Sequence, residues 1–356
     1  MREEESHTNV TLRVGLIGCG HIGSAVHLSN LRRLPGVKIV ALAEPNVERR
    51  EAANRQVPWA AAFSDYRELL DRPDIDATVI CLPNALHAEV GIAALQRDKH
   101  IYLEKPLALG LDDGRELLDA WRRSGKVAMI GFNFRFHPLH LKVRRYLQAN
   151  RIGKLIGVRS VFTTAAHRLP EWKQTRQTGG GVLLDLASHH IDLVRFWFDQ
   201  PVLEIHASVE SHRVEADTAI LELRLANGLL VQSFFSTSSV DDDRFEIYGS
   251  SGKLQLDRFN GWNVGITDLQ RASAPFHRLR QALAGLPRDR FSISKIFSGA
   301  HEPSFASALA HFASAARNGR LTSPDFEDAF QSLAVVIAAE QSARTGGPVR
   351  LSVLPE

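Results

Sequence analysis

The stretch Gly18-Cys19-Gly20-His21-Ile22-Gly23 lies between a short apolar run, Leu12–Ile17, and a segment with helical patterning, Ala25–Arg33. Its spacing is G-x-G-x-x-G. In a strand–turn–helix unit, the first glycine permits a tight turn, the second lets a diphosphate approach the backbone, and the third lets helix and strand pack closely. The helix N-terminus then offers amide groups and a positive dipole end to phosphate. The stretch predicts an α/β fold that binds a dinucleotide; the alternative is a glycine turn without a ligand.

Glu44 strengthens this interpretation because it ends the next apolar run, Val37–Ala43, about twenty residues beyond the last glycine. A carboxylate at that place accepts hydrogen bonds from ribose hydroxyls and repels a 2′-phosphate. The two residues after it are proline and asparagine, not the arginine expected beside a 2′-phosphate. The pattern therefore favours NAD over NADP, although Arg49 and Arg50 lie near enough to keep NADP as the alternative.

Short apolar runs alternate with helical segments through the first 131 residues. The runs are apolar throughout, as strands buried on both faces are. This alternation predicts right-handed βαβ units and a doubly wound parallel sheet, the Rossmann fold, over residues 1–131. The expected strands are Leu12–Ile17, Val37–Ala43, Ala77–Leu82, His100–Leu103 and Val127–Ile130, and the expected helices are Ala25–Arg33, Val47–Arg55, Ala85–Gln96 and Gly114–Ser124.

Residues 132–356 have a different pattern, in which strands follow one another without helices between most of them. Asn227-Gly228 predicts a hairpin turn because both residues tolerate a positive φ, and Ser251-Gly252 predicts a second one. We expect an α+β domain with a large, mainly antiparallel open sheet flanked by helices, which binds substrate and forms oligomers. Its expected strands are 152–166, 201–210, 216–225, 229–238 and 244–257, and its expected helices are Ser304–Arg317 and Asp325–Thr345.

The composition argues against several classes of protein. With 43 basic and 40 acidic residues, the net charge of +3 does not predict a nucleic-acid partner. The apolar runs are far shorter than the roughly 20 residues that cross a bilayer, and the first ten residues contain no signal segment. Cys19 and Cys81 are too few for a disulfide framework, which favours the cytoplasm. The histidine pairs His137/His140 and His189/His190 lack further ligands, so we expect no metal site.

Four further motifs follow the glycine stretch in a fixed order. Together with it, they resemble the Gfo/Idh/MocA family of sugar and cyclitol oxidoreductases, and the resemblance runs from about Leu12 to Leu351. The motifs are Cys81-Leu82-Pro83-Asn84-Ala85-Leu86-His87, Glu104-Lys105-Pro106, Gly131-Phe132-Asn133-Phe134-Arg135-Phe136-His137-Pro138, and Gly179-Gly180-Gly181-Val182-Leu183-Leu184-Asp185 continuing to His189.

The resemblance implies a catalytic set of Lys105, Asp185 and His189. Oxidation of a secondary alcohol needs a base for the hydroxyl proton, and histidine suits this role because its ordinary pKa is near neutrality. A lysine ammonium can hold the substrate oxygen and stabilise developing negative charge. Asp185 and His189 are four residues apart on a predicted helix, so they share a face, which Asp192 extends. The alternatives are a solvated helix face and a surface lysine.

The resemblance also implies cofactor contacts along the later strand ends. Glu104 is expected on the nicotinamide side, and the other residues expected along the cofactor are Pro83, Asn84, His87 and Lys105. Arg135 matches an arginine of the family whose role is partly structural, and it is a candidate substrate residue. His137 replaces the aspartate that usually precedes the proline, so no contact is carried over to it.

Two further segments suggest weaker hypotheses. Arg168 and Trp172 lie in the loop before the glycine run and could contact a sugar ring, although local packing is the alternative. The basic segment 271–299 could bind an anionic group of the substrate or a neighbouring subunit, and a solvated basic helix is its alternative.

The combined prediction is an NAD-dependent dehydrogenase that acts on a hydroxyl or keto carbon of a sugar, sugar derivative or cyclitol. NAD supplies the redox chemistry in such an enzyme. Two other functions stay open: a glycosidase-type enzyme of the family that recycles its NAD, and a non-catalytic dinucleotide-binding regulator. The resemblance further implies a homodimer or homotetramer built on the open sheet.

Overall fold

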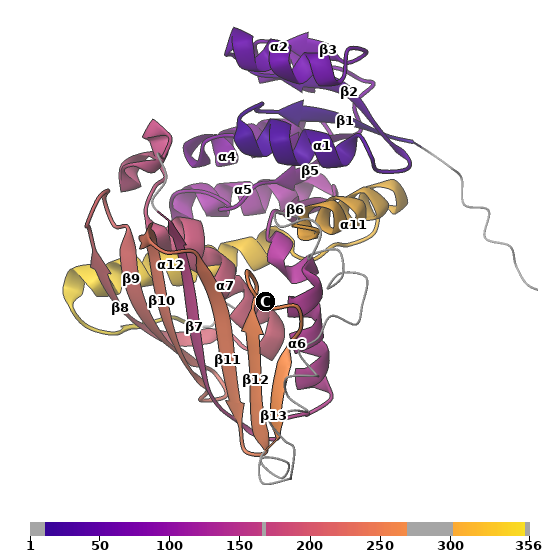
Figure 1. Ribbon diagram of the computed structural model, residues 1–356. Helices are drawn as coiled ribbons and strands as arrows, with labels where there is room; N and C mark the ends of the chain where they lie inside the picture. The colour runs from indigo at the N-terminus through magenta and orange to yellow at the C-terminus, as the bar shows by residue number, and fades with distance from the viewer. Residues whose placement is uncertain (1–10, 166–168, 269–301, 353–356) are drawn as a thin grey trace, which may run out of the picture. The chain divides into compact units, whose positions relative to one another are not determined.

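The computed structural model describes residues 11–165, 169–268 and 302–352 (Figure 1). Their contacts group them into two compact units. The first contains the described residues of Met1–Gly131 together with Phe305–Phe330, and the second contains those of Phe132–Ser304 and Gln331–Glu356. A segment late in the sequence is therefore part of the first unit.

The first unit is built on a six-stranded parallel sheet in the order β3-β2-β1-β4-β5-β6. The strand order changes direction between β1 and β4, the place where open α/β sheets bind ligands at the strands' carboxyl ends. The strands are β1 Leu12–Ile17, β2 Val37–Ala43, β3 Ala61–Phe63, β4 Ala77–Ile80, β5 His100–Leu103 and β6 Ala128–Ile130. This confirms the predicted Rossmann fold.

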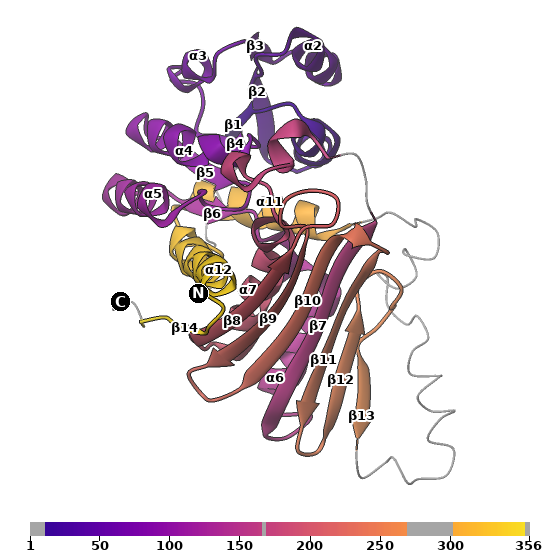
Figure 2. The ribbon, with the colours of Figure 1, turned by 90° about the vertical axis from the view of Figure 1, so that its left-hand side faces the viewer.

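Helices cover both faces of this sheet: α3, α4 and α5 lie on one side, and α2 and α11 on the other (Figure 2). Their bounds are η1 Ile22–Leu28, α1 Ser29–Leu31, α2 Val47–Gln56, α3 Tyr66–Leu70, η2 Asn84–Leu86, α4 His87–Gln96, α5 Leu111–Ser124 and α11 Ser304–Asn318. The helix after the glycine stretch begins as a π-helical turn, η1, and starts earlier than predicted. The short elements β3 and α3 were not predicted because three to five residues carry too little periodicity.

The second unit is built on an eight-stranded sheet in the order β13-β12-β11-β7-β10-β9-β8-β14. Neighbouring strands are antiparallel except β7 and β10, which are parallel. This confirms a mainly antiparallel sheet. The strands are β7 Leu155–Ala165, β8 Val202–Glu210, β9 Thr218–Leu225, β10 Leu230–Ser239, β11 Asp242–Gly249, β12 Gly252–Asp257, β13 Gly265–Asp268 and β14 Val349–Arg350.

The two predicted hairpin turns join neighbouring strands of this sheet. Asn227-Gly228 connects β9 to β10, and Gly228 has a φ of +83°. The turn before Gly252 connects β11 to β12, so the segment expected over 244–257 is a pair of strands. Along β9 and β10, inward side chains are buried and outward ones are exposed in strict alternation over most of each strand.

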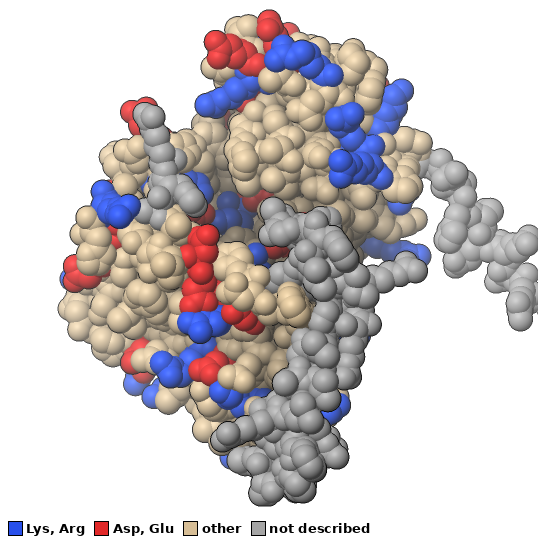
Figure 3. Space-filling model, in the orientation of Figure 1, with Lys and Arg blue, Asp and Glu red and all other residues tan. Residues whose placement is uncertain are grey.

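Helices α6, α7 and α12 lie on one side of the eight-stranded sheet (Figure 2). On the outward face, side chains of β9 and β10 are exposed. The described helices of this unit are α6 Pro138–Gln148, η4 Glu171–Lys173, η5 Arg176–Thr178, the π-helical turn η6 Leu183–Ala187, α7 Ser188–Phe198 and α12 Phe326–Thr345, which begins in the first unit. On the face shown in Figure 3, charges of both signs are interspersed among the described residues. Among the described helices, none has both the length and the apolar character of a bilayer-crossing segment.

Asp217 fixes the turn between β8 and β9. Its carboxylate accepts hydrogen bonds from the backbone amides of His212, Arg213 and Val214 and from Ser238 Oγ, at 2.7–3.2 Å. Burial raises the pKa of this carboxyl, but the hydrogen bonds from Ser238 and the three amides outweigh it and lower the pKa from 3.8 to about 2.

We predict that Asp217→Asn lowers the free energy of unfolding by about 2 kcal/mol at pH 7. The unfolded state binds more protons between pH 4 and pH 2, because the folded-state pKa is the lower one. The contribution of Asp217 is therefore complete above pH 4 and is lost as the pH falls toward 2. Urea unfolding of both proteins at several pH values measures this; a difference that stayed constant down to pH 2.5 would contradict it.

Candidate active site

The three glycines of the stretch have two different steric roles. Gly18 has a φ of +92°, and a Cβ there would lie 2.3 Å from the carbonyl oxygen of Cys81. A Cβ on Gly23 would lie 2.0 Å from the carbonyl oxygen of Gly18. A Cβ on Gly20, in contrast, meets no atom within 4 Å. The first and third glycines are required by the fold, whereas the second leaves space open over the backbone, as the approach of a diphosphate requires.

Glu44 is held beside this loop at the end of β2. Its carboxylate is buried and accepts hydrogen bonds from the amides of Cys19, at 2.8 Å, and Asn46, at 3.1 Å. The Arg50 guanidinium donates to the main-chain oxygen of Glu44 at 2.7 Å. A carboxylate oxygen has lone pairs beyond one such bond, so Glu44 fits the ribose of a dinucleotide. The loop and this carboxylate together suit NAD.

His87 ties two of the predicted motifs together. It is fully buried, with Nδ1 2.6 Å from the carbonyl oxygen of Pro106 and Nε2 3.0 Å from that of Leu82. Burial lowers its pKa, although both carbonyl oxygens oppose this. The segment that begins at Pro83 and Asn84 is thus joined to the E-K-P segment. Contacts of Pro83, Asn84 and His87 with a cofactor stay a prediction.

Glu104 has a partner that the sequence did not indicate. His27 Nε2, on the helical turn after the glycines, lies 2.6 Å from Glu104 Oε1. The His27 ring is buried between Tyr102 and Phe305, with centroid distances of 5.3 and 5.7 Å. Burial raises the pKa of Glu104, but the hydrogen bond and charge of His27 and the charge of Lys105 lower it overall.

This pair connects the glycine-loop helix to the strand end that carries Lys105. One feature of the sequence could have indicated a partner for His27. It lies four residues after Gly23, on a helix that packs on the sheet, and a buried polar side chain there needs a hydrogen-bond partner. The nicotinamide contact expected of Glu104 and the substrate contact expected of Lys105 stay predictions.

In the second unit, Asp185 is paired with Lys173. The Lys173 Nζ donates to both carboxylate oxygens, at 2.9 and 3.0 Å, and each side chain is about a quarter exposed. The two residues share a pocket with the glycines at 180 and 181 and with Asp217. Trp172 lies beside them, with the lysine ammonium 5.4 Å from its ring centroid. No sequence spacing indicated Lys173, because a loop lysine is ordinarily a surface residue.

Asp185 lies in the π-helical turn η6, and His189 follows in the first turn of α7. His189 is 8% exposed and stacks on Phe134, with ring centroids 4.2 Å apart and planes 20° apart. A partly exposed carboxylate and a buried imidazole therefore lie four residues apart on one continuous helical segment. Their catalytic roles stay predictions.

Asp192, which was expected to extend the face shared by Asp185 and His189, has its carboxylate in an ion pair with Arg135. Arg135 donates to both of its oxygens, Nε at 2.8 Å and Nη2 at 2.6 Å, in a buried ion pair. This pair holds the segment Asn133–Phe136 against α7. The substrate role of Arg135 stays a prediction, as does that of Trp172. Arg168 and the basic segment 271–299 lie outside the described residues.

Comparison with known proteins agrees with this arrangement. Residues 12–132 match the family described as "Oxidoreductase family, NAD-binding Rossmann fold", and residues 144–351 match its C-terminal alpha/beta domain. The chain is 30% identical over 348 residues to the uncharacterized oxidoreductase YrbE of Bacillus subtilis, covering 95% of this chain and 96% of that protein. It is 26% identical over 352 residues to scyllo-inositol 2-dehydrogenase (NAD(+)) of B. subtilis, covering 96% and 97%.

A solved structure of levoglucosan dehydrogenase with NADH and L-sorbose has the same fold. It has a TM-score of 0.84 and 24% identity, and the comparison covers 96% of this chain and 99% of that one. These findings confirm the predicted fold, enzyme class and cofactor NAD. The chain therefore belongs to the Gfo/Idh/MocA family of oxidoreductases, with the family's NAD-binding domain in its first 132 residues.

Proposed function

We propose that this protein is an NAD-dependent dehydrogenase that acts on a hydroxyl or keto carbon of a sugar, sugar derivative or cyclitol. The observation that carries the proposal is the segment in which a partly exposed Asp185 is followed one turn later by a buried, stacked His189. The substrates named for the related proteins, an inositol and sugars, support the same choice.

In the proposed mechanism, His189 accepts the proton of the substrate hydroxyl during oxidation and returns it during reduction. Lys105 holds the substrate oxygen and stabilises the negative charge that develops as the proton leaves. Asp185, with Lys173 on its carboxylate, orients a substrate hydroxyl or the imidazole. Bound NAD supplies the acceptor for the hydride.

The loop and Glu44 are proposed to hold the dinucleotide. The open space over Gly20 admits the diphosphate, and the helix that begins after it offers backbone amides. The Glu44 carboxylate is proposed to accept from the adenosine ribose hydroxyls. Net reduction of free NAD by a polyol separates a dehydrogenase from a glycosidase that recycles NAD and from a regulator. A screen of polyols and sugars, beginning with scyllo-inositol, measures this at the absorbance of NADH.

We predict that His189→Ala lowers turnover by about 10²–10⁴-fold, the usual effect of losing a positioned proton acceptor. NAD affinity should be retained, because the glycine loop and Glu44 are untouched. Lys105→Ala should impair both substrate KM and kcat, since its charge acts on the bound substrate and on the transition state. The pH profile of alcohol oxidation should rise through one ionisation and lose that limb in His189→Ala. An alanine variant with normal turnover and the same limb would exclude His189 as the base.

We predict that Gly20→Ala and Gly23→Ala fail in different ways. Gly20→Ala should keep the thermal midpoint of the wild type but weaken NAD binding about tenfold or more, or about 1.4 kcal/mol, because its methyl enters the space proposed for the diphosphate. Gly23→Ala should lower the thermal midpoint, because its Cβ meets the Gly18 carbonyl oxygen.

Calorimetric titration with NAD and a thermal melt of each variant measure these effects. The same titration of the wild type with NADP should give weaker binding than NAD because of Glu44. Equal NAD affinity of wild type and Gly20→Ala would contradict the proposed cofactor position. Equal binding of NADP and NAD would instead contradict the role given to Glu44.

We further propose a homo-oligomer built on the outward face of the eight-stranded sheet. Phe234 on β10 lies opposite Ile220 on β9, and both are exposed, 37% and 48% respectively. Symmetric pairing is the usual way to cover such a face.

We predict that light scattering at micromolar concentration gives a multiple of 39.5 kDa. The variant Phe234→Lys, which places a charge at the centre of the face, should shift the mass toward 39.5 kDa. A wild type that scatters as a 39.5 kDa particle would refute this assembly.

A further inference from the structure

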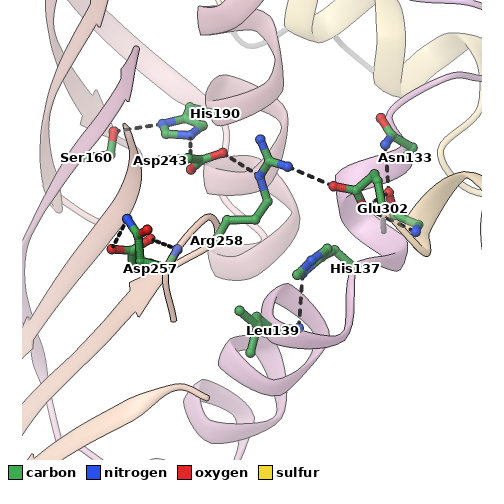
Figure 4. Close-up of polar contacts among 11 residues, drawn as sticks. Asn133, His137, Leu139, Ser160, His190, Asp243, Asp257, Arg258 and Glu302 are labelled. Carbon is green, nitrogen blue, oxygen red and sulfur yellow. Dashed lines mark hydrogen bonds and ion pairs between the residues drawn. The ribbon is translucent and has the colours of Figure 1, made fainter. Parts of the chain in front are cut away.

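A chain of polar and charged side chains crosses the interior of the second unit (Figure 4). At its centre, Arg258 Nε lies 2.6 Å from Asp243 Oδ2, and Arg258 Nη1 lies 2.7 Å from Glu302 Oε2. On the far side of Asp243, His190 Nε2 lies 3.2 Å from Oδ1. Asp243 has no exposed surface and the Arg258 side chain is 10% exposed. Each of the two buried charges thus has two polar partners: Asp243 and Glu302 for Arg258, and Arg258 and His190 for Asp243.

The chain continues to the motif that carries Phe134. Glu302 Oε1 accepts from Ser304 Oγ at 2.5 Å, and that hydroxyl accepts from Asn133 Nδ2 at 2.7 Å. Asn133 directly precedes Phe134 in the sequence. The polar chain is thus attached to the backbone beside this phenylalanine.

Arg258 also contacts the Phe134 ring itself. Its Cζ lies 4.2 Å from the ring centroid, within the range of a cation–π contact. The same ring stacks on His189 at a centroid distance of 4.2 Å and an interplanar angle of 20°. Phe134 therefore lies in contact with both the buried cation and the imidazole to which the proposed mechanism gives the proton transfer.

We propose that Arg258, held by Asp243 and Glu302, is a positioning residue that fixes the Phe134 ring and, through it, the imidazole plane of His189. The consequence for turnover rests on the proposed function of His189; the positioning itself does not. Arg258 makes no contact with substrate in this proposal, and it acts through Phe134, its nearer ring. Phe162 is a more distant second ring, with its centroid 5.5 Å from Arg258 Cζ and 6.4 Å from the His189 ring centroid.

The chemistry of the contacts explains why arginine occupies this position. A planar guanidinium can donate to two carboxylates along its edge while its face covers an aromatic ring, which a lysine ammonium cannot do. Burial lowers the pKa of Arg258, but the charges of Asp243 and Glu302 raise it overall, and Arg258 in turn holds the pKa of Asp243 below its usual range. Both groups therefore stay charged. Buried ion pairs of this kind contribute little net stability compared with apolar residues, so stability alone does not account for this one and the proposal gives it an orienting role.

The test uses full-length Arg258→Met, Arg258→Lys and Phe134→Leu, each compared with Phe235→Leu. Phe235 is a buried core ring whose centroid lies 5.4 Å from that of the His190 ring. Its replacement by leucine is therefore a matched control for loss of aromatic packing. The structural readout is the NMR signal of the His189 ring protons in protein with labelled histidine, assigned with His189→Gln. A ring stacked on phenylalanine has shifted signals. Arg258→Met and Phe134→Leu should move these signals, Arg258→Lys should move them less, and Phe235→Leu should leave them in place.

The kinetic readout uses NAD and the polyol found in the screen. Arg258→Met should lower kcat about 10- to 100-fold, the cost of a misplaced catalytic group, while substrate KM and NAD affinity change little. In a His189→Ala background, Arg258→Met should have no further effect, because the group that it positions is gone. If Arg258→Met does not fold, the same measurements are made on Arg258→Lys, which keeps the charge.

Unchanged His189 signals in both arginine variants would overturn the proposal. An equal loss of kcat with and without His189 would also overturn it, because Arg258 would then act by another route. Full turnover in His189→Ala alone excludes His189 as the base instead, and the NMR comparison still decides whether Arg258 positions the ring.

Discussion

The contact between Gly23 and the carbonyl oxygen of Gly18 is the constraint on which the first unit depends. No side chain fits there, because a Cβ would lie 2.0 Å from that oxygen. The absence of side chains lets the helix begin immediately after β1. Its N-terminus then lies at the carboxyl end of the sheet beside the point where the strand order changes direction, which is where such sheets bind ligands. The helix also brings His27 to Glu104, so one steric condition sets both the dinucleotide loop and the support of the E-K-P segment.

The second unit is organised by buried charge instead. Two arginines approach the segment Asn133–Phe136 in different ways: Arg135 is part of it and pairs with Asp192 on α7, and Arg258 covers the Phe134 ring from β12's end. Each removes its charge from water only because a carboxylate accepts its hydrogen bonds. As a result, the Phe134 ring of this segment has a defined position next to His189.

Both candidate sites also contain a π-helical turn. One, η1, follows the glycines, and the other, η6, contains Asp185. A π-helical turn holds more residues than an α-helical turn and is found often at functional sites. In the second unit, Asp185 lies in this π-helical turn and His189 lies in the first turn of the α-helix that continues it.

The sequence by itself determined the fold and the family, because the features that specify them are local. Apolar runs predicted β1, β2 and β5 with the bounds observed, and Asn227-Gly228 predicted its hairpin. The glycine spacing and the motifs around Lys105 and His189 identified the enzyme class. Only the tertiary structure decided the partners: His27 with Glu104, Lys173 with Asp185, and Arg258 with Asp243. Such pairs join residues that are 12 to 77 positions apart. Their choice depends on which charges are buried together, and a residue pattern along the chain does not contain that information.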